Sequence, residues 1–209
     1  MAHFPIFINL AGKKCALVGG GTVAVRKARM LLDFGALVYV SDPEPAAEME
    51  ELYVQGAITL RKRRYGGPDD LQGAVLAIAA TDDAETNRRV SKDAKALGIP
   101  VNVVDVPELC TFYFPAVARR GELVAGISTS GGYPALAARL RDVLEEVWPD
   151  NLDSKLKVLA EARKQILHRI PDPALRRAIL KDLMKEVLRA RGADENSLRL
   201  LVQDFLNKM

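Results

Sequence analysis

Short apolar runs alternate with segments of helical periodicity through the first half of this 209-residue chain. The apolar runs are Cys15–Gly19, Leu37–Asp42, Ile58–Lys62, Val75–Thr81 and Val101–Asp105. The helical segments between them are Val23–Phe34, Ala46–Gln55 and Glu85–Leu97. Strands that alternate with helices in this way are typical of a parallel sheet covered by helices.

The pattern changes after Asp105. Two apolar runs, 111–118 and 123–128, flank the polar turn 119–122, which predicts a hairpin-like pair of strands. From Pro134 onward the sequence is almost wholly helix-forming, with breaks at Pro149, at 171–173 and at Gly192. We therefore expect an α/β domain over 1–110, a small α+β region of strand pair plus helix over 111–150, and an all-helical region over 151–209.

The first strand leads into a glycine-rich turn. Residues 14–24 read KCALVGGGTVA, in which Gly19 and Gly21 match the first two glycines of the dinucleotide motif G-x-G-x-x-G/A and Ala24 matches its last position. The first glycine permits the tight turn, the second lets the backbone approach a pyrophosphate, and the helix N-terminus favours the anion. The motif predicts a Rossmann-type sheet. The alternative is a glycine turn that only packs a helix onto a strand.

An acidic residue follows the second strand. Asp42 lies about 20 residues beyond the glycines, where a carboxylate accepts hydrogen bonds from the adenosine ribose and repels a 2′-phosphate. NAD is therefore expected as the cofactor, in preference to NADP.

Composition is that of a globular enzyme. About half of the residues are apolar (49%), and no apolar run approaches the length that crosses a bilayer. The N-terminus lacks a positive region before its short apolar segment, so we expect no signal peptide and a cytoplasmic protein. Cys15 and Cys110 are too few for a disulfide framework and have no metal-ligand spacing.

Charge is distributed unevenly. Residues 151–209 hold 13 Lys and Arg against 8 Asp and Glu, which raises nucleic-acid binding as an alternative. The charges alternate in sign along helices with regular apolar spacing, as they do on solvated amphipathic helices, and we expect no nucleic-acid partner. A second basic set, Arg26, Lys27, Arg29 and 61–64, would flank the cofactor cleft and suggests an acidic substrate; a solvent-facing charge run is the alternative.

Acidic residues also follow the fourth and fifth strands. Asp82 and Asp83 are predicted as the N-cap and a first-turn acid of the helix near Glu85. Asp105 follows the apolar run Val101–Val104, where partial desolvation would raise the pKa of a carboxyl group and suit it to proton transfer. Asp105 could equally initiate the turn at Pro107.

Four motifs along the chain, taken together, resemble those of a known protein family. They are GGGTVAVRK at 19–27, AIAATDD at 77–83, NVVD at 102–105 and STSGGYPA at 128–135. With them the chain resembles precorrin-2 dehydrogenases and the sirohydrochlorin-forming module of siroheme synthases, well over 1–150 and only in character beyond. The resemblance implies NAD-dependent oxidation of the tetrapyrrole precorrin-2 to sirohydrochlorin, in siroheme or cobalamin biosynthesis, by an intertwined homodimer. No membrane partner is expected, because no apolar run is long enough to cross a bilayer.

The resemblance also assigns roles to residues of this chain. Asp105 matches the family's catalytic aspartate, and Ser128 is similar to a position at the tetrapyrrole pocket. The cations expected to pair with substrate carboxylates are Arg26, Arg29, Arg63 and Arg119. The expected cofactor contacts are Gly19, Gly21, Thr22, Val23, Asp42, Pro43, Glu44, Thr81 and Asn102.

Two other functions stay open. Some family members also insert iron into sirohydrochlorin, with Asp105 best placed to accept the ring protons, but His3 and His168 have no metal-ligand spacing and no resident metal is expected. A non-catalytic NAD-sensing module would use the glycine turn and Asp42 but would not depend on Asp105. We expect the dimer contact over 111–147, with Leu136 and Leu140 on its apolar face.

Overall fold

A five-stranded parallel sheet forms the centre of the first part of the protein. In the computed structural model, which describes residues 3–149 and 151–208, its strands are β1 (Lys14–Val18), β2 (Leu37–Ser41), β3 (Ile58–Arg61), β4 (Leu76–Ala79) and β5 (Val101–Val103). Their order is β3-β2-β1-β4-β5, with every neighbouring pair parallel. The order reverses between β1 and β4, which is the position where such sheets bind ligands. The predicted Rossmann-type architecture is confirmed.

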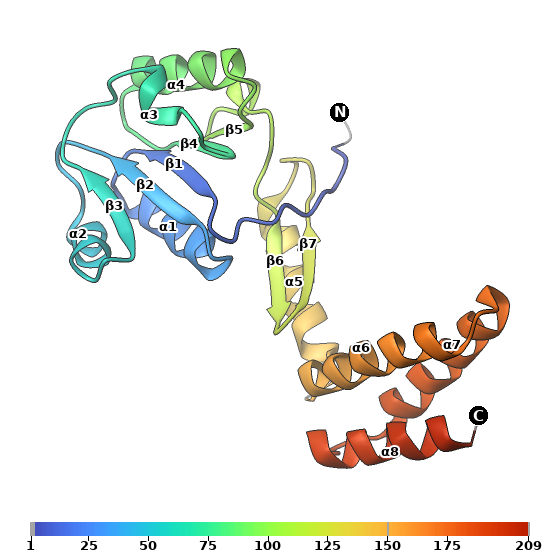
Figure 1. Ribbon diagram of the computed structural model, residues 1–209. Helices are drawn as coiled ribbons and strands as arrows, with labels where there is room; N and C mark the ends of the chain where they lie inside the picture. Colours follow the sequence, from blue (N-terminus) through green and yellow to red (C-terminus); the bar gives the residue numbers. More distant parts are fainter. Residues whose placement is uncertain (1–2, 150, 209) are drawn as a thin grey trace. The chain divides into compact units, whose positions relative to one another are not determined.

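Helices cover both faces of this sheet (Figure 1). They are α1 (Thr22–Asp33), α2 (Ala47–Val54), α3 (Pro68–Leu71) and α4 (Ala84–Ala96), followed by a 3₁₀ turn, η1 (Pro107–Leu109). One apolar core lies between the sheet and α1 with α2, and includes Val25, Leu31 and Met49. A second core lies on the other face, with Leu71 of α3 and Val90 of α4.

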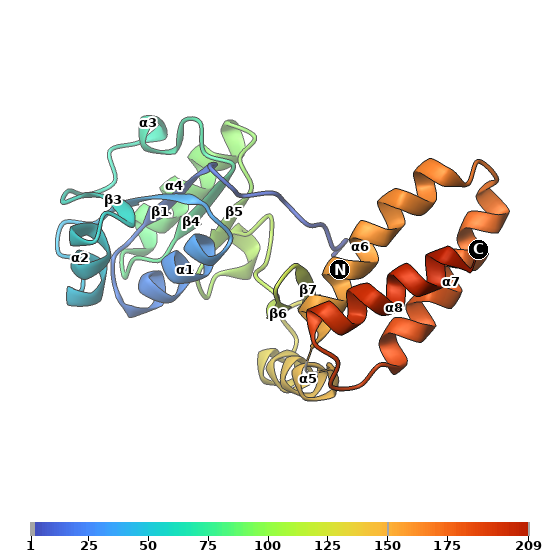
Figure 2. The ribbon, with the colours of Figure 1, turned by 60° about the horizontal axis from the view of Figure 1, so that its bottom comes forward.

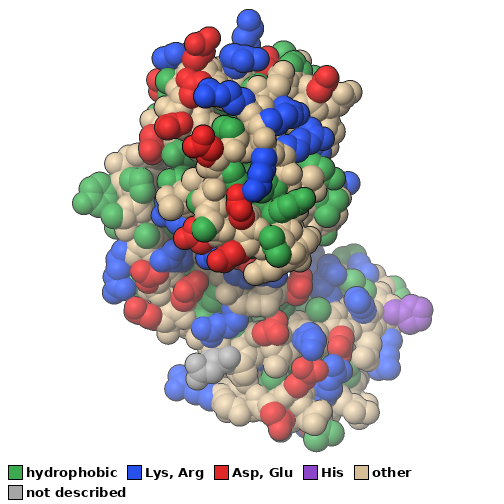
Figure 3. All heavy atoms as spheres, turned by 90° about the vertical axis from the view of Figure 1, so that its left-hand side faces the viewer, with side chains coloured by type: hydrophobic (Ala, Val, Ile, Leu, Met, Phe, Trp, Pro, Cys, Tyr) green, Lys and Arg blue, Asp and Glu red, His purple; other side chains and the backbone are tan. Residues whose placement is uncertain are grey.

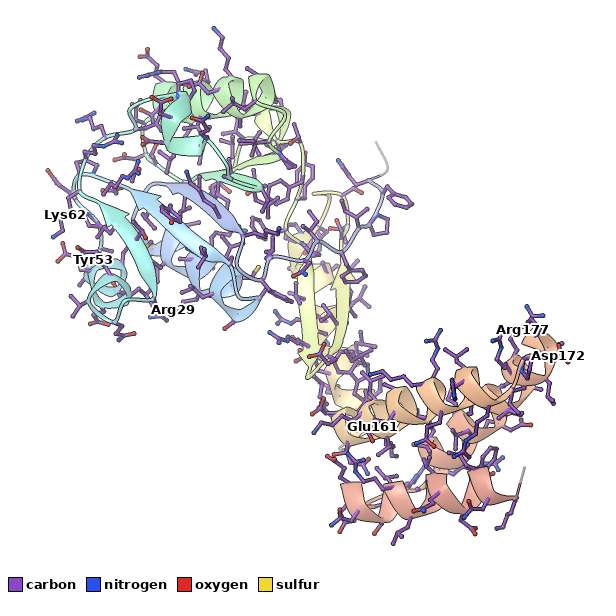
Figure 4. The ribbon with its side chains drawn as sticks, in the orientation of Figure 1. Arg29, Tyr53, Lys62, Glu161, Asp172 and Arg177 are labelled. Atoms are coloured by element: carbon purple, nitrogen blue, oxygen red, sulfur yellow. The ribbon has the colours of Figure 1, made fainter. Side chains whose placement is uncertain are left out.

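The second part begins with an antiparallel hairpin of β6 (Ala116–Arg120) and β7 (Leu123–Ile127), against which α5 (Pro134–Val147) packs. Three helices follow: α6 (Leu152–Arg169), α7 (Pro173–Arg189) and α8 (Glu195–Asn207), which lie together in Figure 2. They share a core that includes Ile166, Leu183 and Leu198. Asp172, labelled in Figure 4, caps α7 by accepting the backbone N–H of Ala174 at 2.9 Å.

The chain divides into two compact units, which meet between Phe114 and Pro115. This boundary lies four residues beyond the predicted end of the first domain, because Phe112 and Phe114 pack against the first unit's core and the backbone N–H of Thr111 donates to the carbonyl of Val101 at 2.8 Å. The strand predicted over 111–118 therefore begins only at Ala116. Asp150, the last residue of the predicted segment 111–150, lies outside the described residues, as does Met209.

Acidic and basic side chains are interspersed over the face drawn in Figure 3. No helix of the described part of the chain is both long and apolar enough to span a membrane.

Candidate functional site

A large cavity opens at the carboxyl edge of the parallel sheet. Its volume is about 1000 Å³, and it lies within the first unit. The segments that follow β1, β2, β4 and β5 all contribute to its wall, because the carboxyl ends of parallel strands meet at one edge. The predicted site residues on this wall are Gly21, Thr22, Val23, Asp42, Pro43, Glu44, Thr81 and Asp105.

The glycine turn at this edge requires two of its glycines for packing. Gly19 has φ +109°, and a Cβ there would lie 2.3 Å from the carbonyl oxygen of Ala80. A Cβ on Gly20 would lie 2.9 Å from that of Pro45. The motif identifies Gly19, whereas Gly20 was not predicted because its contact comes from a segment distant in sequence.

Gly21 has a different role. It is the N-cap of α1 with φ −74°, and a Cβ there would meet nothing within 4 Å. The first turn of α1 has no side-chain cap and no acidic residue, so its backbone N–H groups are left to bind an anion from the cavity. The open space at Gly21 and these N–H groups fit the pyrophosphate of a dinucleotide.

Asp42 connects the end of β2 to two backbone segments. Its Oδ2 accepts the N–H of Gly20 at 2.7 Å and its Oδ1 accepts the N–H of Glu44 at 2.7 Å. Each carboxylate oxygen can accept more than one hydrogen bond. The side chain therefore orients the glycine turn and still has acceptor capacity at the cavity wall for a ribose hydroxyl.

The end of β4 is held by a side-chain pair. The hydroxyl of Thr81 donates to Oδ1 of Asn87 at 2.8 Å, and Nδ2 of Asn87 donates back to the carbonyl of Thr81 at 2.9 Å. Asn87 is buried and lines the cavity, yet no sequence motif marked it. The N-cap of α4 is Asp83, which accepts the N–H of Glu85 at 3.0 Å, and Asp82 precedes the cap, so the predicted cap lies one residue further along the chain than expected.

Asp105 stands just beyond β5, in the left-handed region at φ +59°. Its side chain lines the cavity and is exposed, so the desolvation expected from the preceding apolar run is not observed. The thiol of Cys110 braces this turn: Sγ accepts the N–H of Val103 at 3.2 Å and contacts the carbonyl of Val106 at 3.4 Å. Cys110 thus holds the backbone on both sides of Asp105.

Seven of the predicted site residues are not among those that line the cavity: Gly19, Asn102, Ser128, Arg26, Arg29, Arg63 and Arg119. Asn102 is buried in β5, and its Nδ2 donates to the carbonyl of Phe112 at 3.1 Å. Ser128 and Arg119 belong to the second unit, where Ser128 accepts the N–H of Ser130 at 3.1 Å and Arg119 donates to the carbonyl of Gly121 at 3.2 Å. Their predicted roles stay predictions.

Arg63 forms an ion pair with Asp70. Its guanidinium donates to both carboxylate oxygens of the buried Asp70, at 2.5 and 2.9 Å, and Arg61 donates to the same carboxylate at 2.8 Å. Burial alone would raise the pKa of Asp70, but the hydrogen bonds from Arg63 and from the backbone of Gly66 outweigh it and lower that pKa. This cluster fixes the loop after β3, and with it Arg64, which lines the cavity.

Arg26 and Arg29 are exposed on α1 and do not line the cavity; Figure 4 labels Arg29. The cavity wall instead carries Arg64 and Arg88. No group of three potential metal-ligating His, Cys, Asp or Glu residues occurs within residues 3–149 and 151–208.

Comparison with protein families decides the classification. The model of a family described as putative NAD(P)-binding matches residues 6–116, which is more than half of the chain. The chain belongs to this NAD(P)-binding family. The match spans the whole parallel sheet and the cavity described above, so the family's region and the candidate site coincide.

Individual relatives extend the similarity beyond the NAD(P)-binding region. The siroheme synthase of Azotobacter vinelandii is 39% identical over 204 residues, covering 96% of this chain and 44% of that protein. That of Nitrosomonas eutropha is 43% identical over 166 residues, covering 79% of this chain and 35% of the relative. The chain thus spans less than half the length of these relatives.

A solved structure shares the fold of both units. The precorrin-2 dehydrogenase SirC matches with a TM-score of 0.70 and 24% sequence identity, over 99% of this chain and 98% of that chain. The fold of this chain, a parallel sheet followed by a hairpin with a helix and a helical region, is therefore shared with a solved structure.

Proposed function

We propose that this chain oxidises precorrin-2 to sirohydrochlorin with NAD as the hydride acceptor. The observation that carries the proposal is a single cavity lined both by the glycine turn at Gly21 and by the carboxylate of Asp105. It is supported by the similarity to siroheme synthases over nearly the whole chain and by the fold shared with a precorrin-2 dehydrogenase.

The residues that would hold NAD are distributed along the wall of the cavity. The N–H groups at the start of α1, at Thr22 and Val23, bind the pyrophosphate, while Asp42 and Glu44 face the adenosine ribose. Thr81, fixed by Asn87, lies further along the same edge. When bound, NAD supplies the carbon that accepts a hydride from the substrate.

Asp105 would handle the proton of the reaction. Oxidation of the macrocycle removes a hydride and a proton, and the hydride leaves with the cofactor. The exposed carboxylate of Asp105 can accept the proton and release it to water, while its braced backbone keeps it at the cavity edge. The protein would further accelerate the reaction by aligning the ring carbon with the nicotinamide.

The substrate is expected to be recognised through its carboxylates. Arg26, Arg29 and Arg119 remain proposed partners, together with Ser128, and the cavity itself offers Arg64 and Arg88. Arg63 already has Asp70 as its partner and contributes less to this set.

We also propose that the enzyme is a cytoplasmic homodimer. Leu136 and Leu140 stand one helical turn apart on α5 and are 48% and 45% exposed, beside the exposed Tyr133 and Val147. A second copy of the chain would bury this apolar face.

The test is anaerobic turnover of enzymatically prepared precorrin-2 with NAD, followed by NADH formation and the sirohydrochlorin spectrum. The decisive variant is Asp105→Asn, because asparagine tolerates the left-handed backbone at this position better than alanine does. We expect at least about a hundredfold loss of turnover with unchanged NAD binding. The matched control Asp69→Asn removes an exposed acid of α3 and should leave turnover intact.

Two outcomes would contradict the proposal. A wild-type protein that binds NAD but leaves precorrin-2 unchanged would favour the sensor or a different anionic substrate. Full activity of Asp105→Asn would remove Asp105 from the mechanism.

A further inference from the structure

Lys27 is a partly buried cation of the first unit. It lies in α1 and is half-buried, and its ammonium lies 3.8 Å from the centroid of the Phe114 ring. The Phe114 ring in turn packs edge-on against Phe112 at 5.2 Å. The ammonium thus rests on a fixed aromatic surface, where a cation–π contact replaces part of its hydration.

The charged neighbours of this ammonium come from two elements. Burial lowers the pKa of Lys27, and so does the charge of Arg26 on the same helix, while Asp105 and Cys110, from the segment after β5, raise it. The net shift of the pKa of Lys27 is downward, so the interactions with Asp105 and Cys110 do not outweigh the loss of hydration. Within the described residues, Lys27 takes part in none of the salt bridges.

Other cations of the first unit differ from Lys27 in this respect. Arg26 and Arg29 are exposed and keep their hydration, and Arg63 is bound to Asp70. A partly dehydrated cation with unused donors gains more from an incoming carboxylate than a hydrated one does, because less water has to be displaced.

We propose that Lys27 anchors an acidic side group of the substrate next to Asp105. This inference deepens the proposed function and rests on it for the identity of the substrate. Lys27 is absent from the wall of the cavity that fits the dinucleotide, whereas Asp105 belongs to that wall. The anchored group therefore lies outside the cofactor volume, on the Lys27 side of Asp105.

The kinetic test uses Lys27→Met, which keeps the unbranched stem and its contact with Phe114 but removes the charge. We expect KM for precorrin-2 to rise about tenfold to a hundredfold, as for the loss of a charged hydrogen bond. The values of kcat and of KM for NAD should change by less than about threefold, the pattern of lost substrate binding. Lys27→Arg should recover most of the affinity.

The matched control is Lys14→Met. Lys14 also lies over an aromatic ring, 5.2 Å from the centroid of Tyr39, and donates to the carbonyl of Gln72 at 2.8 Å, away from the cavity. Its loss should leave KM for precorrin-2 unchanged. A Lys27→Met enzyme with the wild-type KM would overturn the inference while leaving the proposed function intact.

A second measurement does not depend on turnover or on the variant folding. The ¹³Cε signal of Lys27 is titrated by NMR in the wild-type protein, with and without uroporphyrin I, a polycarboxylated tetrapyrrole used as the probe. Binding of a probe carboxylate should raise the pKa of Lys27, because an opposite charge favours the ammonium form. If the wild-type protein fails to oxidise precorrin-2, the proposed function falls, and this titration alone decides the role of Lys27. A titration unaffected by saturating probe, or no binding of the probe, would overturn it.

Discussion

The carboxylate of Asp42 accepts the backbone N–H of Gly20 at 2.7 Å. This bond joins the end of β2 to the turn between β1 and α1, two segments that are 22 residues apart. The second oxygen accepts the N–H of Glu44, so one side chain orders both backbone segments at the cavity wall.

Replacing Asp42 with alanine should therefore weaken cofactor binding in two ways. The glycine turn loses its brace, and the ribose loses its acceptor, so we expect the Kd for NAD to rise at least about tenfold. Discrimination against NADP should fall as well, because the repelling charge is gone. Calorimetric titration with both dinucleotides measures this, with Asp69→Ala as the control. Unchanged affinity for NAD would show that Asp42 contributes to neither interaction.

Gly19 and Gly21 should respond differently to alanine. In Gly19→Ala the new methyl collides with the carbonyl of Ala80 on a left-handed backbone, and we expect a loss of about 2–4 kcal/mol in the free energy of unfolding. In Gly21→Ala the methyl enters open space, so unfolding should change by less than about 1 kcal/mol. NAD affinity should nevertheless fall, because the methyl occupies the approach to the pyrophosphate.

Thermal melting combined with NAD titration distinguishes the two variants, and each serves as the control for the other. The assignment would be contradicted by a Gly21→Ala protein that melts like wild type and binds NAD equally well.

Asp70 should stabilise the loop after β3 in a pH-dependent manner. Its pKa is lowered in the folded state relative to an unfolded value of about 3.9, so its contribution is complete above that pH and is lost as the pH falls through the folded pKa. At about pH 7, Asp70→Asn should cost about 1–3 kcal/mol of unfolding free energy, since Arg61 and Arg63 lose a buried acceptor.

Urea unfolding at neutral and acidic pH checks this prediction. The difference between wild type and Asp70→Asn should shrink on acidification, whereas the exposed neighbour Asp69→Asn should differ little from wild type at either pH. A constant difference at every pH would exclude the ionised carboxylate as its source.

The apolar face of α5 should control assembly. The double variant Leu136→Asp and Leu140→Asp places two charges on the proposed dimer contact, and we expect it to sediment as a monomer. Leu200→Asp is the matched control, because Leu200 is 68% exposed on α8, outside this face. A wild-type protein that is already monomeric, or a variant that stays dimeric, would refute the assignment.

Local sequence patterns predict most of the strands and helices of this fold. The apolar runs ending at Gly19, Asp42 and Thr81 lie on strands whose observed ends differ by one or two residues, because strand and helix periodicities are properties of neighbouring residues. An acidic N-cap at the start of α4 was predictable to within one residue for the same reason, since a cap bonds to backbone groups two or three residues away; the cap is Asp83 where Asp82 was expected.

The geometry of the site depends more on contacts between residues that are distant in sequence. Pro45 leaves no space for a side chain at Gly20, and Thr81 is hydrogen-bonded to Asn87. Arg63 forms an ion pair with Asp70. No linear motif indicates any of these contacts. The boundary between the units lies four residues beyond the predicted one, because Phe112 and Phe114 pack against the core of the first unit.

The order of strands and helices along the chain, the glycine turn, and the acids at the ends of β2 and β5 all follow from local sequence patterns. Which cations are free to bind a substrate follows only from the folded structure. Arg63 and Lys27 both belong to short basic runs of the sequence, yet Arg63 is paired with Asp70 whereas the ammonium of Lys27 lies over the Phe114 ring. Burial and partners set the chemistry of a charged side chain, and both come from residues that are brought close only when the chain folds.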